Sequence, residues 1–309
     1  MTIKNIKLAA IAGMMILTVA SCMKDDSSAQ KAEEKRILDQ YILANNITVT
    51  PTKSGLYYIE TLAGTGDSAE LKTWIEIEFT GRVVSNNAVF ITSDMQVAKD
   101  NNIFIEGIYY GPTRRILGYI PYAGLNQGIA MMREGGKARL IFPSDLGMGG
   151  LSAQNVPSYS SMIFDIELLH VIPDPGSYES GLMMEYLQAN GISTDSTDSG
   201  IYIKVTTPGV GDFPTEGNEV TLTYTGKFMN GIVFDGINKS LKLQIGANSV
   251  IPGFEDGVKL INEGGSARIV IPYYYAYGDY GKVDSYLRSV IPPFTTLVFD
   301  ITVNSITKK

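Results

Sequence analysis

The chain of 309 residues has one cysteine, one histidine and one tryptophan. A single cysteine cannot close a disulfide within the chain, so the hydrophobic core must hold the fold even in an oxidising compartment. The single histidine, His170, has no partner of its own kind to share a metal with. The sequence also lacks a P-loop, a GxGxxG turn and a CxxC pair. We therefore predict neither a metal nor a cofactor.

Basic residues are scarce as well. Without Lys4 and Lys7, 23 lysines and arginines face 32 acidic residues, which gives a formal charge near −9. A protein that binds nucleic acid needs a concentrated basic face to neutralise phosphates. We therefore predict no nucleic-acid partner.

An apolar run over residues 8–19 follows the basic start of the chain. It is shorter than the roughly 20 residues that a membrane-spanning helix needs. The small residues Ala20 and Ser21 come next, and this order is typical of a cleavable export signal. We predict a signal peptide over residues 1–21 and a polar, flexible tether over residues 22–36.

The segment Val19-Ala20-Ser21-Cys22 resembles the lipobox of bacterial lipoproteins. The resemblance implies that Cys22 is acylated and anchors the protein to a membrane of the bacterial cell envelope. Met23 stands where some Gram-negative bacteria place an aspartate for inner-membrane retention. This favours the outer membrane, with the protein facing the periplasm or the cell surface. An ordinary signal peptide with an incidental cysteine is the alternative.

Two long segments of the chain repeat each other. Residues 41–67 align with residues 186–212 at a constant offset of 145. Later motifs, such as Glu-Gly-Gly at 134–136 and at 263–265, align at another offset because the loops between them differ in length. A period this long indicates a duplicated domain rather than a solenoid. We predict a first domain over residues 37–172, a linker helix over 173–196 and a second domain over 197–309.

The sequence pattern in each copy predicts a leading helix followed by strands. The helices carry apolar stripes with i, i+1, i+4, i+5 spacing, formed by Ile37, Leu38, Tyr41 and Ile42 and by Leu182, Met183, Tyr186 and Leu187. Such a stripe packs on its own domain or pairs two chains as a homodimer. Apolar residues then alternate, as at Val220, Leu222 and Tyr224, and residues 253–261 predict one covering helix. The predicted fold is α+β, with an antiparallel sheet wrapped over a short helix in each copy.

The second copy contains five motif blocks in register. They are Tyr224-Thr225-Gly226, Gly231-Ile232-Val233-Phe234-Asp235, Val250-Ile251-Pro252-Gly253-Phe254-Glu255-Asp256-Gly257, Tyr275-Ala276-Tyr277-Gly278, and Ile291-Pro292-Pro293 before Leu297-Val298-Phe299-Asp300. In this order and spacing they resemble the FKBP-type peptidyl-prolyl cis-trans isomerases over about residues 200–307.

The resemblance implies a proline pocket. Its catalytic residues would be Tyr224, Phe234, Asp235, Ile251, Tyr277 and Phe299, and its further substrate-binding residues Leu241, Val250, Phe254 and Val290. The Ile251 N–H and the Tyr277 hydroxyl would be its polar contacts, and Phe254 its floor, where the family often has tryptophan. The chain between Asp235 and Leu241 is shorter than in the family, and no arginine stands there to pair with Asp235.

Such a pocket needs no nucleophile. Amide resonance sets a barrier of about 18–20 kcal/mol to rotation. The twisted transition state has lost that resonance and part of its charge separation, so a water-poor aromatic slot binds it better than the planar ground state. A thousandfold acceleration requires only about 4 kcal/mol.

The first copy lacks the same chemistry. Phe79 replaces Tyr224, Ile91 replaces Asp235, Leu125 replaces Phe254 and Met148 replaces Tyr277 in the alignment, and residues 91–120 are expanded. We predict that this copy keeps the fold and is inactive.

Two functions are consistent with the sequence. One is an envelope-anchored prolyl isomerase that acts through its second domain on proline-containing exported polypeptides. The other is a non-catalytic module that binds an exported protein, a peptide or a glycan. The degenerate first copy favours the second function, as do the tyrosines Tyr273, Tyr274, Tyr280 and Tyr286. Convergence of Asp235, Tyr277 and Phe299 on one empty apolar cleft would favour the isomerase.

Overall fold

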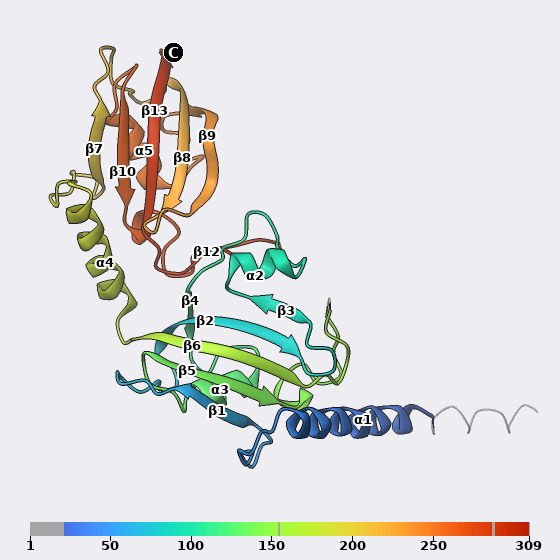
Figure 1. Ribbon diagram of the computed structural model, residues 1–309. Helices are drawn as coiled ribbons and strands as arrows, with labels where there is room; N and C mark the ends of the chain where they lie inside the picture. The colour runs from blue at the N-terminus through green and yellow to red at the C-terminus, as the bar shows by residue number, and fades with distance from the viewer. Residues whose placement is uncertain (1–21, 154, 286–287, 309) are drawn as a thin grey trace, which may run out of the picture. The chain divides into compact units, whose positions relative to one another are not determined.

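The computed structural model in Figure 1 describes residues 22–153, 155–285 and 288–308, with the side chains of residues 22–26 left out. The predicted signal peptide and Tyr286 lie outside the described residues. The chain forms two compact units. The first contains the residues up to Lys72, Ile77–Ile103 and Ile116–Leu169, and the second contains Thr73–Glu76, Phe104–Arg115 and the residues from His170.

The first sheet is antiparallel and has the order β1-β5-β6-β2-β3, with β4 paired to β2. Its strands are β1 (Tyr57–Leu62), β2 (Trp74–Val83), β3 (Val89–Thr92), β4 (Thr113–Ile116), β5 (Gly136–Phe142) and β6 (Met162–Ile172).

The second sheet has the order β7-β10-β13-β8-β9 and a separate hairpin of β11 and β12. Its strands are β7 (Tyr202–Thr207), β8 (Glu219–Phe228), β9 (Val233–Gln244), β10 (Ser266–Ile271) and β13 (Leu297–Thr307), and the hairpin joins β11 (Lys282–Val283) to β12 (Ser289–Ile291). Because β7, β10, β13, β8 and β9 follow one another as β1, β5, β6, β2 and β3 do, the predicted duplication of an α+β domain is confirmed.

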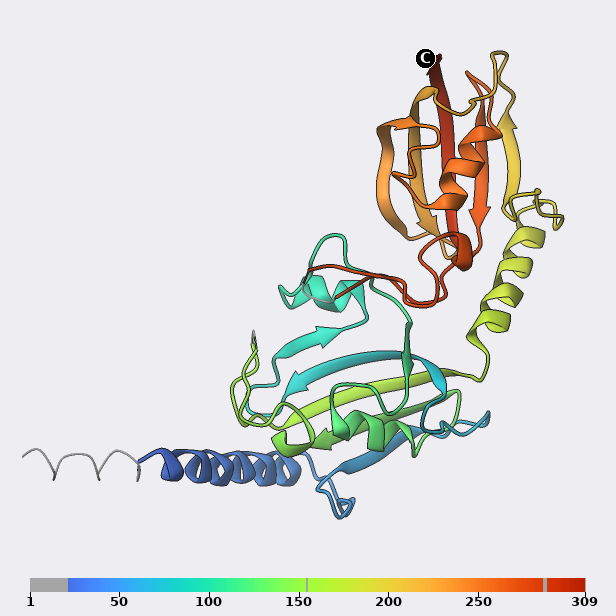
Figure 2. The ribbon, with the colours of Figure 1, turned by 180° about the vertical axis from the view of Figure 1, so that it is seen from behind.

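One short helix covers each sheet. These helices are α3 (Ala123–Ile129) and α5 (Pro252–Lys259), and a 3₁₀ turn follows the next strand in each copy, at Ser144–Leu146 and Tyr273–Tyr275. Figure 2 shows α5 lying across one face of the second sheet. Phe254 and Val258 of α5 are buried there. Val220, Leu222 and Tyr224 of β8, which alternate in the sequence, are buried. Alternate residues of β10 and β13, such as Ile269 and Ile301, are buried as well.

The first leading helix begins earlier than predicted, whereas the second lies inside the linker helix predicted over residues 173–196. They are α1 (Cys22–Ala44) and α4 (Pro175–Ala189), and a further helix, α2 (Met95–Asp100), follows β3. The expectation of a flexible tether over residues 22–36 is therefore wrong. Alanine, glutamate and lysine give this segment a high helix propensity, and ion pairs of Arg36 with Glu33 and of Lys35 with Asp39 add to it. Among the described helices, none has both the length and the apolar character that a membrane span requires.

The apolar stripes pack on their own units. In the first unit, Leu38 of α1 forms a cluster with Val84, Ile141 and Ile163. In the second unit, Met183 and Leu187 of α4 form the equivalent cluster with Val270 and Val298. This is the first of the two alternatives that the sequence left open for the stripes.

A buried glutamate fixes each leading helix, and the two glutamates stand 145 positions apart. Glu34 accepts hydrogen bonds from Ser144 N and Oγ (2.5 and 2.7 Å) and from Ser161 Oγ (2.7 Å). Glu179 accepts a hydrogen bond from Thr296 N at 2.6 Å and forms an ion pair with Arg114 at 2.8 Å. The duplicated helix–sheet contact is thus kept, although the residues that satisfy the carboxylates have changed.

The two compact units do not follow the predicted domain boundaries, which remain a prediction. We expected residues 37–172 to form one continuous domain, but Thr73–Glu76 and Phe104–Arg115 belong to the second unit. Burial of Arg114, which is 7% exposed, explains why: its guanidinium has its acidic partners in that unit.

Candidate functional site

Four aromatic rings form a continuous cluster in the second unit. Tyr224 of β8 lies 5.4 Å from Phe254 of α5, and Phe254 lies 5.0 Å from Phe299 of β13, between ring centroids. Phe234 of β9 lies 5.5 Å from Phe299. All three contacts are edge-to-face, the geometry that aromatic quadrupoles favour. Strands β8, β9 and β13 and helix α5 thus each contribute one ring.

The other predicted residues lie against the same cluster. Tyr224, Phe254 and Phe299 are buried, whereas Phe234 is partly exposed. Five more partly buried residues pack on this core: Leu241, Val250, Ile251, Tyr277 and Val290. Lys282 on β11 places its ammonium 5.4 Å from the centre of the Tyr277 ring. The structure therefore brings together every apolar residue that the sequence assigned to the pocket.

Asp235 joins the cluster through a hydrogen bond. The Tyr224 hydroxyl donates to Asp235 Oδ2 at 2.7 Å. Burial, with this carboxylate as the second cause, raises the pKa of Tyr224 above its usual value, so the phenol remains a donor at neutral pH. Asp235 thus has a hydrogen-bond partner within its largely apolar surroundings.

Lys239 is a site residue that sequence reasoning missed. Its ammonium lies 3.0 Å from Asp235 Oδ1 and 6.0 Å from the centre of the Tyr224 ring. The sequence offered no arginine for Asp235, and this lysine supplies the positive charge instead. Gly236 has φ +52°, and a Cβ there would stand 2.4 Å from Lys239 Cβ, so a glycine is required for Lys239 to turn back. The spacing of four residues gave no signal by itself, because a regular strand would keep the two side chains apart.

Gly226 makes room for two of the rings. A Cβ at this position would stand 2.8 Å from Phe234 Cζ and 2.8 Å from Phe299 Cε1, closer than carbon atoms approach. Gly226 lies between Tyr224 and Phe228 on β8, and it faces Phe299 and Asp235 in the strand register. The glycine of the Tyr-Thr-Gly motif is therefore a steric requirement of the aromatic cluster.

Ile251 lies at the N-terminal end of α5. It is the N-cap residue, with extended backbone angles, and Pro252 occupies the first helical turn. Proline suits that position because the first turn of a helix needs no N–H donor there. In the described part of the chain, no acceptor takes the Ile251 N–H. This donor therefore lies at the start of a helix, in a residue that packs on the aromatic cluster.

The first unit has a different set of residues at the equivalent positions. Phe164, the counterpart of Phe299, contacts Phe90 at 5.7 Å and Phe79 at 6.5 Å. Ile91, in the place of Asp235, is 37% exposed, and Leu125, in the place of Phe254, is buried. Three rings of the pocket frame are kept, but the ring on the covering helix and the carboxylate–phenol pair have no counterpart at these positions.

A charged triad is kept in both units. Asp165 pairs with Arg82 and Arg139, and Asp300 pairs with Lys227 and Arg268. Burial raises the pKa of each aspartate, but hydrogen bonds from the two cations outweigh it and hold the pKa below its usual value. These carboxylates therefore stay ionised and structural, in contrast to the aspartate of the aromatic site.

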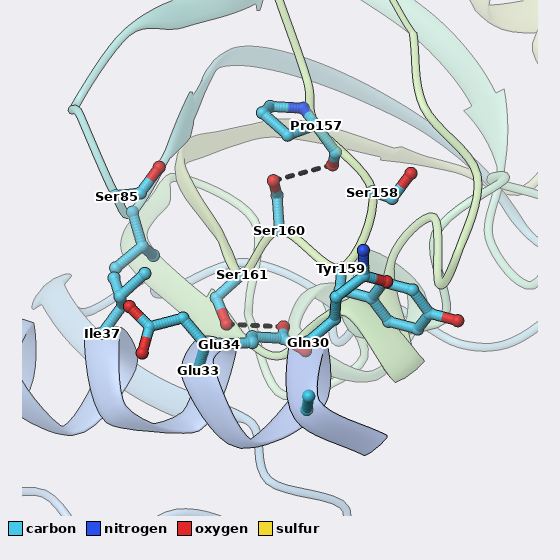
Figure 3. Close-up of a pocket in the computed structure, with 12 residues that line it drawn as sticks. Gln30, Glu33, Glu34, Ile37, Ser85, Pro157, Ser158, Tyr159, Ser160 and Ser161 are labelled. Carbon is cyan, nitrogen blue, oxygen red and sulfur yellow. Dashed lines mark hydrogen bonds between the residues drawn. The ribbon is translucent and has the colours of Figure 1, made fainter. Parts of the chain in front are cut away.

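A separate cavity of about 390 Å³ lies in the first unit, between α1 and the loop before β6 (Figure 3). Its walls are formed by Gln30, Glu33, Glu34 and Ile37 on α1 and by the loop from Pro157 to Ser161. Glu34 is already hydrogen bonded, and Glu33 pairs with Arg36. The lining of this cavity thus contains hydroxyl groups, and none of its residues belongs to the aromatic cluster of the second unit.

Comparisons with known proteins agree with the motif blocks. The sequence model of the FKBP-type peptidyl-prolyl cis-trans isomerases matches residues 66–169 and 211–304. The FKBP-type 22 kDa peptidyl-prolyl cis-trans isomerase of Escherichia coli K12 is 35% identical over 121 residues, which are 38% of this chain and 56% of that protein. FK506-binding protein 1 of Candida glabrata is 37% identical over 112 residues, 35% of this chain and 94% of that protein.

A solved structure of a peptidyl-prolyl isomerase from Pseudomonas syringae is 27% identical, with a TM-score of 0.39 over 45% of this chain and 98% of that one. The chain spans about half the length of the bacterial relatives that it matches first. The two matches of the family model together cover more than half of the chain, once in each repeat. The chain belongs to the FKBP-type peptidyl-prolyl cis-trans isomerase family and contains two tandem copies of the family's domain.

Proposed function

We propose that this protein is a peptidyl-prolyl cis-trans isomerase and that its second repeat catalyses X–Pro rotation in exported polypeptides. The observation that carries the proposal is the hydrogen bond between Tyr224 and Asp235 inside the aromatic cluster. Tyr224 is buried and the Asp235 side chain is 39% exposed, so the carboxylate lies at the edge of the apolar cluster, where an unpaired polar group would be costly. In a binding site for a twisted amide, the Tyr224–Asp235 hydrogen bond would fix the position of one edge of the site while its walls stay apolar.

The chemistry follows from the walls. The proline ring of a substrate would lie against Phe254 and Phe299, the most buried rings of the cluster. In such a slot water cannot stabilise the planar, charge-separated amide, so the rotated amide is bound preferentially. The barrier falls by the difference between the two binding free energies, without any bond being made or broken.

Two donors would hold the substrate backbone. The Ile251 N–H at the start of α5 would bind a substrate carbonyl, and the Tyr277 hydroxyl would bind a second one across the site. Both come from rigid positions, a helix end and a turn after the 3₁₀ segment Tyr273–Tyr275. Fixed donors select the rotated geometry because they need no reorganisation when it forms.

Phe234→Ala tests the proposal against a matched variant, Phe90→Ala, at the equivalent position of the first repeat. Phe234 contacts Phe299 and Phe228, so its loss opens one wall of the site. We expect the mature chain to accelerate cis–trans exchange of a short proline peptide and Phe234→Ala to lower kcat/KM about tenfold. Phe90→Ala should leave kcat/KM unchanged. NMR exchange spectroscopy gives the rates.

Other outcomes have definite meanings. Equal losses in the two variants would contradict the assignment of catalysis to the second repeat. A folded chain without any acceleration would favour the binding function instead. Tyr280, which is 90% exposed, and Tyr274, which is 56% exposed, would then be the first surface residues to substitute.

We also propose that the protein is exported and lipid-anchored at Cys22 in the bacterial cell envelope. The support is the residue order before Cys22, together with the bacterial relatives of FkpA type. Expressed in a Gram-negative bacterium, the unsubstituted chain should partition with membranes, and Cys22→Ser should be released into a soluble fraction or retained as an unprocessed precursor. Mass spectrometry of the N-terminus measures acylation directly. A mature N-terminus at any residue other than Cys22 would disprove the anchor.

A further inference from the structure

The segment Phe104–Arg115 connects α2 to β4 of the first repeat, yet it belongs to the second unit. It lies in the expanded part of the first copy, for which the second copy has no equivalent. The duplicated fold therefore does not explain why this segment belongs to the second unit. Two sets of contacts explain it, one made by Arg114 and one made by Tyr109.

The end of this segment is anchored by Arg114. The guanidinium lies 3.0 Å from Glu76 and 2.8 Å from Glu179, and it donates to the Phe294 carbonyl at 2.7 Å. It also lies 5.5 Å from the centre of the Tyr178 ring. Breaking one member of a buried ion pair is strongly unfavourable, so the segment has a fixed base.

The tip of the segment contacts the rim of the aromatic site. The Tyr109 N–H donates to the Ser289 carbonyl, at the start of β12, at 2.9 Å. The Tyr109 ring meets Phe228 edge-to-face at 4.9 Å and packs on the same cluster as the site residues. Gly111 has φ +149°, and a Cβ there would stand 2.6 Å from the Tyr109 hydroxyl. The loop is thus shaped to hold this ring.

The row of rings leads from Tyr109 into the site. Phe228 lies 5.0 Å from Phe234, and Phe234 lies 5.5 Å from Phe299. Val290, the predicted rim residue, directly follows Ser289, to which Tyr109 is hydrogen bonded. The second repeat has only a short connection after Asp235 and extends β9 through it.

We propose that Tyr109 is a specificity-determining residue of the isomerase site, and that it forms a subsite for a large apolar residue next to the substrate proline. The proposal rests on the proposed function. A partly exposed ring that contacts Phe228 and is held by a hydrogen bond to Ser289 extends the apolar wall beyond the proline slot. Peptides with a bulky residue beside proline gain contacts with it, and peptides with alanine there do not.

Tyr109→Ala in the otherwise intact mature chain tests the subsite, with Tyr109→Phe as the matched control. Two peptides are compared, one with phenylalanine and one with alanine before proline. We expect the ratio of their kcat/KM values to fall about three- to tenfold in Tyr109→Ala, the range for loss of an aromatic contact, and to remain unchanged in Tyr109→Phe. Trp74 fluorescence in denaturant verifies that the unit stays folded.

The alternatives give different results. An unchanged ratio in an active, folded Tyr109→Ala chain overturns the subsite and leaves the proposed function intact. An equal rise in both rates also overturns it, because it would identify Tyr109 as a plug of the site. No acceleration of either peptide by the unsubstituted chain overturns the proposed function itself.

Discussion

Gly226→Ala should lower kcat/KM for X–Pro isomerisation by about a hundredfold, more than the loss of a single wall of the site. The added methyl group would stand 2.8 Å from both Phe234 and Phe299, so the two rings cannot keep their positions together. Displacing catalytic groups by about 1 Å costs on the order of a hundredfold in rate. Exchange spectroscopy on a proline peptide measures the effect, with the mature chain as catalyst.

Gly81→Ala is the matched control for this prediction. Gly81 is the counterpart in the first repeat, and a Cβ there would stand 2.7 Å from Phe164 and 2.7 Å from Ile91. Both substitutions overpack a strand to a similar degree, at about 1–3 kcal/mol of stability. We expect Gly81→Ala to keep the full rate. A similar rate loss in both variants would mean that the effect is on folding and not on the site.

Arg114→Ala should destabilise the second unit by about 3–5 kcal/mol, because it leaves two acidic groups without their cation in a buried setting. Glu179 is only 2% exposed and Glu76 13% exposed at the side chain. Trp74 is the one tryptophan of the chain, and its ring lies 5.2 Å from Phe294, next to this ion cluster. Denaturant unfolding followed by Trp74 fluorescence therefore reports on this unit.

Two comparisons separate charge from lost packing. Arg36→Ala removes an arginine from an exposed pair with Glu33, and we expect a loss of less than about 1 kcal/mol. Adding Glu76→Gln and Glu179→Gln to Arg114→Ala should restore part of the loss, since glutamine keeps an acceptor for the Thr296 N–H without the buried charge. A triple variant no more stable than Arg114→Ala alone would contradict the electrostatic explanation.

The strands could be predicted because their signal is local, and the aromatic residues of the site could be predicted because their motifs resemble those of a known family. Period-2 alternation identifies the inward side of β8, β10 and β13, and the motif blocks place Tyr224, Phe254 and Phe299 on three elements that pack together. Each block specifies its own short element, and the order of the blocks fixes which elements meet.

Lys239 could not be predicted in the same way. It reaches Asp235 only because Gly236 and Asn238 both adopt positive φ angles within β9. A strand that alternates regularly would place residues 235 and 239 on one face but about 13 Å apart along the chain direction. The backbone irregularity, and not the spacing, brings the lysine back.

The path of residues 104–115 and the start of α1 also could not be predicted from the neighbouring sequence. Arg114 reads as a surface residue in sequence, since arginines are rarely buried without partners. Its partners Glu76 and Glu179 are 38 and 65 positions away in the chain. Helix α1 begins in a polar segment whose composition suits both a helix and a disordered tether, and the buried Glu34 decides between them.

The composition of the second unit has a consequence for biosynthesis. Residues 73–76 and 104–115 leave the ribosome long before the residues from His170 onward, with which they fold. During translation, the first repeat can form its own sheet before the partners of Trp74 and Arg114 in the second unit have been synthesised. A chain truncated before α4 would therefore leave Trp74 and Arg114 without their contacts to Phe294 and Glu179.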